Sequence, residues 1–296
     1  QIAAPIETVH GSLRDFRQWL EWSPWLIAEP ECRVEYAANG KSYQWDGNIV
    51  GAGELAMVGE KAGSIDYRLT FTRPWKSVNA SAFRLRESGG QTSVTWTMDG
   101  TLPWYFFFMK GMMTTYVGMD YQRGLDMLKD KLERGSVPSK LNFPGPRARE
   151  GFSYVATRRA CPIPDLGSKM AEDLTRVHAW FEESGTKSVG QPFSLYHKWD
   201  AGKQRVEYTT GLPVAEVPAS LPEGLVGGEV PACTVYPVEH TGAYRHLGNA
   251  WSSGIMHGRA KVFQQSRKIV PFEVYENDPK EVAEEDLRTV VSFPLK

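Results

Sequence analysis

The chain has 296 residues, of which 41% are hydrophobic and 23% are charged. This composition is typical of a globular protein and excludes a disordered or fibrous one, and the length favours two domains over one. Because 34 basic residues stand against 35 acidic ones, the formal charge is −1. No overall positive field gathers phosphate groups, so we expect no direct nucleic-acid partner.

Cysteine usage and hydropathy bear on the compartment. The three cysteines are far apart and form no CxxC pair, which disfavours a disulfide framework and favours a cytoplasmic location: Cys32, Cys161 and Cys233. The longest apolar run, Leu102–Met113, is shorter than the about 20 residues that a membrane-spanning helix needs. Since the chain begins at Gln1 without a methionine, we expect that native residues upstream have been removed, and a membrane contact only through such a segment.

The period of the apolar residues predicts the elements of the first half. Residues 1–4 have a strand-like pattern, and apolar spacings of three and four then predict an amphipathic helix over residues 5–20. A long helix with an apolar face over residues 121–132 ends this half, with Gly135 as its C-terminal cap. Between the helices the period changes to two, which predicts six antiparallel strands: Cys32–Ala37, Ser42–Asn48, Glu54–Gly59, Ile65–Phe71, Val78–Arg86 and Val94–Met98.

A sheet of this length with one polar face has to curl its apolar face around another element. The long helix is the amphipathic element available, so we expect a curved sheet that grips this helix and leaves a cavity. Tryptophan and methionine are concentrated in this half and suit an adaptable apolar lining. Trp45 and Trp96 are candidate ligand contacts, with core packing as the alternative for each.

Five segments of residues 1–134 form a distinctive set: Ala3–Val9, Trp22–Trp25, Tyr43–Asn48 with Gly51 and Gly53, Thr92–Met98, and Gly124–Lys129. Together they resemble the polyketide cyclase/dehydrase branch of the START-like (SRPBCC) superfamily. The resemblance implies a helix-grip fold around a deep hydrophobic cavity, which binds lipids or polyketides and in some members is catalytic.

Residues 135–150 separate the two halves. They are rich in glycine and proline, have no apolar period, and carry the basic residues Lys140, Arg147 and Arg149. This composition is typical of a solvated interdomain linker. We therefore predict a first domain over residues 1–134, a linker over 135–150 and a second domain over 151–296.

The second half contains an internal repeat. Gln191–Tyr196 recurs as Val270–Tyr275, and Leu212–Val214 recurs as Phe293–Leu295. These segments follow a predicted strand and helix in each copy, so the repeating unit is β-α-β-β.

Each copy opens with a strand, Phe152–Arg158 or Cys233–Glu239, and continues into a helix, over residues 165–185 or roughly 244–265. Two such units placed side by side form a continuous sheet backed by helices. We expect a cleft near the pseudo-twofold axis where the two copies meet. The predicted fold class of the whole chain is α+β.

Several motifs of residues 150–296 carry a second resemblance: Gly190–Phe193 with Tyr196, Leu221–Gly224, His240–Tyr244, Ala250 with Trp251, Pro271–Tyr275 and Asn277–Pro279. They resemble the GyrI-like small-molecule-binding domain, the effector-binding part of multidrug-responsive transcription regulators. The resemblance implies an acidic residue in an aromatic-lined cleft that receives lipophilic, often cationic, ligands. The position that matches this acidic residue is Glu273.

Glu273 also stands out within the repeat, because it replaces Ser194 of the first copy and is followed by Tyr275. A carboxylate in an apolar cleft is destabilised unless a cation or hydrogen bonds compensate, and aromatic faces attract cations. This combination favours an organic cation as ligand; the alternative is a Glu273 that points outward from an edge strand or caps a turn. Further candidate wall residues, with core packing as the alternative, are aromatic: Tyr196, Trp199, Tyr244 and Trp251.

Other chemistry lacks its motifs. There is no GxGxxG after a strand, no P-loop and no HExxH, and the histidines show no metal-ligand spacing, so we predict neither cofactor nor metal. Neither half contains a convincing helix-turn-helix. The regulators that carry the second domain usually place a DNA-binding module before it, whereas this chain carries the cyclase-like domain there.

These observations favour a two-domain protein that binds or senses lipophilic small molecules, with organic cations at the second cleft and without a DNA-binding module. One alternative is an enzyme, a cyclase or hydratase in the first cavity or a hydrolase in the second with Glu273 as general base. Another is a regulator that transmits ligand occupancy to a protein partner.

Overall fold

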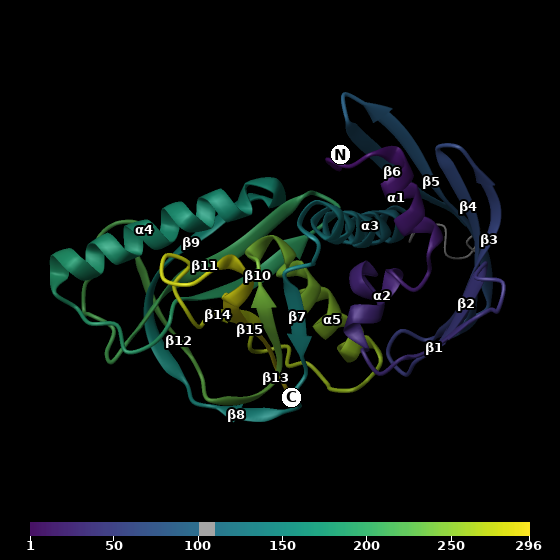
Figure 1. The fold of residues 1–296 in the computed structure, drawn as a ribbon. Coiled ribbons are helices and arrows are strands. Elements are labelled where there is room, and N and C mark those ends of the chain that lie inside the picture. The colour runs from purple at the N-terminus through teal and green to yellow at the C-terminus, as the bar shows by residue number, and fades with distance from the viewer. Residues whose placement is uncertain (101–109) are drawn as a thin grey trace. The chain divides into compact units, whose positions relative to one another are not determined.

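The structure is a computed structural model that describes residues 1–100 and 110–296 (Figure 1). Residues 102–109 of the apolar run considered above therefore lie outside the described part. Within the described part, no helix is long and apolar enough to cross a membrane. The chain divides into two compact units, Gln1–Pro138 and Ser139–Lys296, and each unit has its own sheet.

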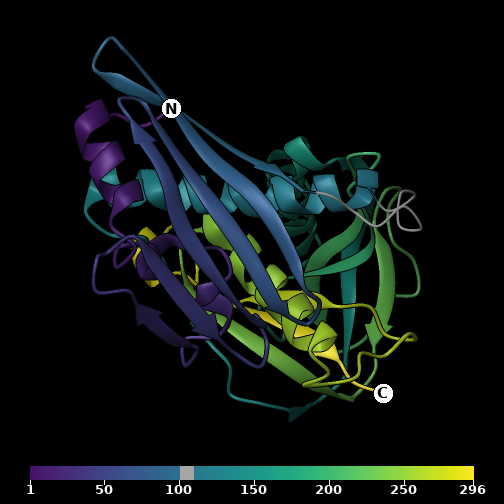
Figure 2. The same ribbon diagram turned by 90° about the vertical axis from the view of Figure 1, so that its right-hand side faces the viewer.

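The first unit is a six-stranded antiparallel meander with a long helix across it (Figure 2). Its strands keep the order of the chain because short turns join consecutive strands: β1 (Arg33–Tyr36), β2 (Ser42–Asp46), β3 (Ala52–Lys61), β4 (Ser64–Arg73), β5 (Ser77–Ser88) and β6 (Gln91–Asp99). The helices of this unit are α1 (Ile6–Arg14), α2 (Trp19–Trp22) and α3 (Lys110–Arg134).

The helix predicted over residues 5–20 is interrupted at Asp15. The backbone of Asp15 is extended, with ψ at 98°, and its Oδ1 accepts a hydrogen bond from the backbone N–H of Arg17 at 3.0 Å. Aspartate side chains that bond to nearby backbone groups compete with helical hydrogen bonds. The apolar period therefore continues through two helices, α1 and α2, rather than one.

Aromatic rings join α3 to the first sheet. Tyr121 of α3 stacks on Trp96 of β6, with ring centroids 4.0 Å apart and planes 4° from parallel. Met127 and Leu128 of α3 are also buried in the same hydrophobic cluster. A sheet that closes on a helix in this way is the arrangement that the sequence predicts for the first half.

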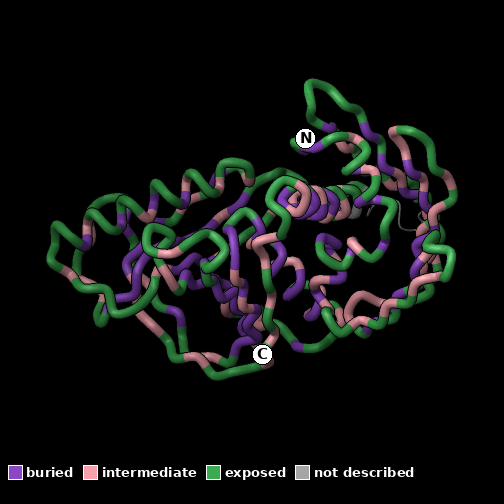
Figure 3. The backbone as a smooth tube through the Cα atoms, viewed as in Figure 1, coloured by how far each residue is buried: buried purple, intermediate pink, exposed green. Residues whose placement is uncertain are grey.

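The second unit is a nine-stranded sheet in the order β12-β9-β11-β10-β14-β15-β13-β7, with β8 paired to β13. Its strands are β7 (Ser139–Asn142), β8 (Arg147–Arg149), β9 (Phe152–Pro162), β10 (Phe193–Asp200), β11 (Arg205–Val214), β12 (Val226–Val230), β13 (Cys233–Gly242), β14 (Phe272–Tyr275) and β15 (Arg288–Pro294). Its helices are α4 (Leu166–Ser184) and α5 (Gly248–Arg259). In Figure 3 the exposed residues of α4 lie on the side away from the sheet. The α+β class predicted for the chain is confirmed.

Residues 135–150, expected as a linker, contribute strands β7 and β8 to the second sheet, and both pair with β13. These two strands could not be predicted from the apolar pattern, because each is three or four residues long and prolines lie between them. The second repeat also differs from expectation. Its helix spans Gly248–Arg259 rather than 244–265, since a 3-10 turn precedes it and Lys261 adopts a left-handed φ of 62° just after it.

The register of β10 and β14 locates the axis of the repeat. Phe193 lies opposite Val274, Ser194 opposite Glu273, and Leu195 opposite Phe272. In the repeat, Ser194 corresponds to Glu273, so exchanging the two copies turns the Phe193–Val274 pair into the Leu195–Phe272 pair. The Ser194–Glu273 pair maps onto itself. The pseudo-twofold axis therefore passes between Ser194 and Glu273.

Candidate functional site

The site around Glu273 is built on the helix-covered face of the second sheet. Side chains alternate between the two faces of a strand, so Ser194 and Tyr196 of β10 share a face with Glu273 and Tyr275 of β14. The indole of Trp251, a residue of α5, lies against this face and bonds to Glu273. The opposite face carries apolar side chains of the same strands, among them Phe193, Leu195, Phe272 and Val274.

Glu273 is buried, with 1% of its surface exposed, and accepts three side-chain hydrogen bonds. Oε1 accepts from the hydroxyl of Tyr275 at 2.5 Å and from that of Tyr196 at 2.8 Å, and Oε2 accepts from Trp251 Nε1 at 2.7 Å. Burial raises the pKa of the Glu273 carboxyl above its ordinary value, while the three hydrogen bonds act in the opposite direction. Since β14 lies between β10 and β15, the outward-pointing alternative is wrong.

The two tyrosines that bond to Glu273 are equivalent residues of the repeat. Burial, followed by the charge of Glu273, raises the pKa of both Tyr196 and Tyr275 well above the usual range. Both hydroxyls therefore stay protonated and donate hydrogen bonds at neutral pH. The Tyr275 oxygen also lies 3.0 Å from Ser194 Oγ and 3.0 Å from Met170 Sδ of α4.

The other predicted wall residues extend the site to the surface. The Trp251 ring lies 4.7 Å from the Tyr196 ring, at 70° to it. Trp199 lies 6.4 Å from the Tyr196 ring and is 40% exposed. Tyr244 lies 5.8 Å from the Tyr275 ring and is 37% exposed. The structure thus brings Tyr196, Tyr275 and Trp251 onto the Glu273 carboxylate. Trp199 and Tyr244 lie one ring further out.

Trp45 and Trp96, the candidates of the first half, are both buried in its hydrophobic cluster. Trp96 stacks on Tyr121 and lies 4.7 Å from the ring of Phe83. Trp45 lies 5.7 Å from the ring of Phe71. These contacts are the core packing that we kept as the alternative role for each residue.

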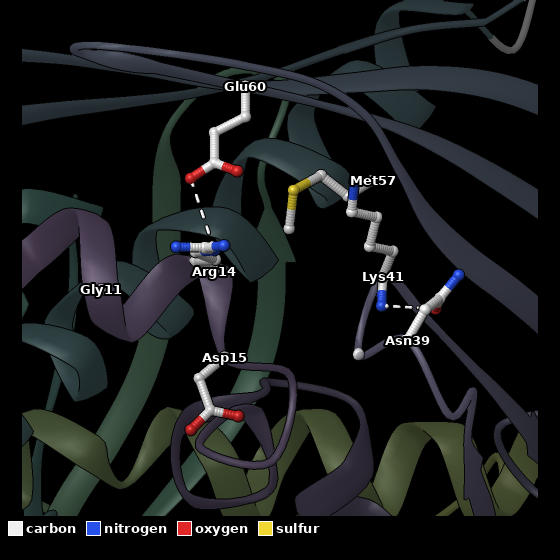
Figure 4. Close-up of a pocket in the computed structure, with 8 residues that line it drawn as sticks. Gly11, Arg14, Asp15, Asn39, Lys41, Met57 and Glu60 are labelled. Carbon is white, nitrogen blue, oxygen red and sulfur yellow. Dashed lines mark hydrogen bonds and ion pairs between the residues drawn. The ribbon is translucent and has the colours of Figure 1, made fainter.

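One pocket of the first unit lies between the end of α1, the turn that joins β1 to β2, and β3, and has a volume of about 250 Å³ (Figure 4). Five of its eight lining residues have polar or charged side chains, with Arg14 Nε 3.4 Å from Glu60 Oε1, and Met57 adds an apolar contact. None of the residues that the sequence singled out lines it. The complete lining is Gly11, Arg14, Asp15, Asn39, Gly40, Lys41, Met57 and Glu60.

Sequence reasoning missed two contributors to the Glu273 site. Ser194 was noted as the counterpart of Glu273, but nothing in the sequence placed it directly opposite. Met170 belongs to the apolar stripe of its helix, which indicates packing and not a sulfur beside two hydroxyls. The described residues contain no group of three His, Cys, Asp or Glu that could hold a metal ion.

Family comparison assigns both halves of the chain. Residues 1–133 match the family described as polyketide cyclase/dehydrase and lipid transport. Residues 152–296 match the GyrI-like small-molecule-binding domain. Each half of the chain therefore matches a family of its own. Both resemblances found in the sequence are confirmed, and both domains are of small-molecule-binding types.

Solved structures similar to the chain share little sequence with it. The EcmrR–DNA complex has 16% identity and a TM-score of 0.46, over 63% of this chain and 66% of that one, slightly under two thirds. SAV2435 bound to tetraphenylphosphonium has 10% identity and a TM-score of 0.40, over 51% and 92%. CV1439 from Chromobacterium violaceum has 17% identity and a TM-score of 0.35, over 45% and 93%. The curated proteins include no significant match.

Proposed function

We propose that this chain is a non-catalytic binding protein whose GyrI-like domain receives lipophilic organic cations at Glu273. The observation that carries the proposal is a buried carboxylate surrounded by neutral donors and aromatic rings. Within the described part of the chain, no Lys, Arg or His forms an ion pair with Glu273. A ligand cation would supply the missing countercharge.

The first copy of the repeat shows the contrasting case. Asp173 of α4 is also buried, but Arg159 Nε donates to both of its carboxylate oxygens, at 3.0 and 2.8 Å. The hydroxyl of Tyr208 donates to Asp173 Oδ2 at 2.7 Å. A buried carboxylate is costly without a countercharge. The domain supplies one for Asp173 and none for Glu273, which supports a ligand role for Glu273.

The rings around Glu273 favour an organic cation over a metal ion or ammonium. Tyr196, Trp251, Trp199 and Tyr244 offer aromatic faces, and a cation over such a face gains about 0.5–2 kcal/mol. The same rings bury apolar groups of the ligand. A ligand whose positive charge is delocalised and surrounded by apolar groups would gain both from the attraction of the ring faces and from the burial of its apolar surface.

The test compares two ions of similar shape and opposite charge on the full chain. Calorimetric titration with tetraphenylphosphonium and with tetraphenylborate should show binding of the cation only. Glu273→Gln keeps the size of the side chain and should weaken cation binding at least about tenfold, which is about 1.4 kcal/mol. Equal binding of both ions, or unchanged affinity in Glu273→Gln, contradicts the proposal.

A matched control replaces a carboxylate outside the site. Glu207 of β11 pairs with Arg158 on the surface, so Glu207→Gln should leave cation affinity unchanged. Turnover of an ester that Glu273→Gln abolishes while binding persists would instead support the hydrolase alternative.

A further inference from the structure

Two rows of side chains cross the helix-covered face of the GyrI-like domain, one in each copy of the repeat. In the first row, Tyr196 of β10 lies opposite Tyr208 of β11, which lies opposite Arg159 of β9. In the second row, Tyr275 of β14 lies opposite Thr289 of β15, which lies opposite His240 of β13. The pseudo-twofold axis exchanges the two rows, so Thr289 corresponds to Tyr208 and His240 corresponds to Arg159.

The polar groups of the first row have partners within the protein. Asp173 of α4 accepts hydrogen bonds from Arg159 and from Tyr208, and the hydroxyl of Tyr196 donates to Glu273. The guanidinium of Arg159 and the hydroxyls of Tyr208 and Tyr196 therefore all donate to carboxylates of the protein.

The second row is different. Asn249 Nδ2 donates to Ser139 Oγ at 3.0 Å, and Ser139 Oγ lies 3.1 Å from His240 Nε2, where we assign the Ser139 hydroxyl as the donor. This bond places the imidazole proton on Nδ1. Among the described residues, neither His240 Nδ1 nor Thr289 Oγ1 has a hydrogen-bond partner, although both residues are almost completely buried. Buried polar groups in native proteins are nearly always paired, so these two indicate an acceptor from outside the chain.

The acceptor that suits this position is uncharged. Burial lowers the pKa of His240 to about 4, with a further contribution from His246, so the imidazole is neutral at pH 7. A neutral N–H and a hydroxyl match a carbonyl, ester or ether oxygen, whereas a carboxylate would be buried without a countercharge.

Thr289 lies close to Glu273 in the sheet. Glu273 lies opposite Val291, and Thr289 is two residues from Val291, so Glu273 and Thr289 are diagonal neighbours across β14 and β15. Diagonal neighbours in antiparallel strands lie about 7–8 Å apart. That separation corresponds to a cationic centre and an oxygen on opposite sides of one aromatic ring.

We propose that His240 and Thr289 form a second subsite, which receives a neutral hydrogen-bond acceptor carried by the same organic cation that binds at Glu273. This inference rests on the proposed function and narrows its ligand class. The cation would be bifunctional, with its charge at Glu273 and an oxygen acceptor toward β13. Selectivity among lipophilic cations would then come from the acceptor.

The test uses two probes that differ only in the acceptor: benzyltriphenylphosphonium and its 4-methoxycarbonyl derivative. Titration of the full chain should show the ester cation binding about tenfold more tightly than the parent, the preference expected from the net contribution of one hydrogen bond. Thr289→Val removes the hydroxyl at nearly constant size and should reduce that preference to about threefold or less. Its affinity for the parent cation should stay unchanged.

A matched control is available on the same strand. Ser292 Oγ is also buried without a partner among the described residues, but Ser292 lies opposite Phe272 on the other face of the sheet. Ser292→Ala should therefore keep the full preference for the ester cation. Thr289→Val should unfold at the same or a higher temperature than the native chain, because it removes an unpaired buried hydroxyl.

The outcomes separate the two proposals. If both phosphonium cations bind the native chain equally, or if Thr289→Val keeps the preference, the acceptor subsite is wrong while cation binding at Glu273 stands. If neither cation binds, both proposals fail. Loss of the preference in Thr289→Val but not in Ser292→Ala supports the subsite.

Discussion

Ser194 and Glu273 face each other across β10 and β14, at the point where the pseudo-twofold axis of the repeat crosses the sheet. A duplicated sequence places the same residue on both sides of such an axis unless one copy changes. Here one copy keeps a hydroxyl and the other carries a carboxylate, while Tyr196 and Tyr275 keep the symmetry and both donate to that carboxylate. A single acidic site at the centre of two pseudo-equivalent halves is the result.

Cation affinity should depend on pH through Glu273. Its folded pKa is raised by burial, so a proton and a cation compete for the carboxylate above the ordinary glutamate value of 4.5. Affinity for tetraphenylphosphonium should therefore rise with pH until the raised pKa is passed and then level off. Titrations between pH 4 and pH 8 measure this, and a flat profile in the native chain would contradict it.

The same shift predicts the stability of the ligand-free chain. A carboxyl whose pKa is higher in the folded than in the unfolded state binds more protons when folded, so the free energy of unfolding falls as pH rises between the two pKa values. The Glu273→Gln variant has no titrating group at this position, so its free energy of unfolding should lose this part of the pH dependence. Urea denaturation of both chains across that pH range is the measurement.

The Tyr196 hydroxyl should matter separately from its ring. Tyr196→Phe keeps the ring that packs edge-to-face against Trp251 but removes one donor to Glu273, which should cost about 1–2 kcal/mol of cation binding by making the carboxylate harder to ionise. Tyr196→Leu removes the ring as well and should weaken binding further. Equal losses in the two variants would mean that the ring contributes nothing to the cation.

Much of this arrangement could be predicted from the sequence. The repeat Gln191–Tyr196 and Val270–Tyr275 was sufficient to propose two β-α-β-β units and to single out Glu273, because period-two alternation and local motifs are visible along the chain. The resemblance to the GyrI-like domain further predicted that aromatic side chains line the site around Glu273.

The remainder depends on contacts between residues far apart in the sequence. The pairing of Ser194 with Glu273 is a matter of strand register, which local patterns do not determine. The strands β7 and β8 are too short to show a period, and their pairing partner β13 lies almost a hundred residues later. The unpaired atoms of His240 and Thr289 become visible only when every neighbour is placed.

Asp173 and Glu207 should differ strongly in what they contribute to stability. Asp173 is buried and binds both Arg159 and Tyr208, so Asp173→Asn should lower the free energy of unfolding by about 1–3 kcal/mol. Glu207 is partly exposed in its pair with Arg158, and Glu207→Gln should cost less than about 1 kcal/mol. Denaturation of both variants decides this, and similar losses would show that the buried cluster is not a stabilising unit.

Trp96 provides the test of packing against ligand binding in the polyketide cyclase-like domain. Its ring stacks between Phe83 and Tyr121, and replacing a buried tryptophan by alanine typically costs about 3–5 kcal/mol because a cavity remains. Trp96→Ala should therefore destabilise this domain by that amount, with Trp75→Ala as the control, since Trp75 is largely exposed. A Trp96→Ala variant that keeps its stability but loses affinity for a fatty acid would instead identify Trp96 as a ligand contact.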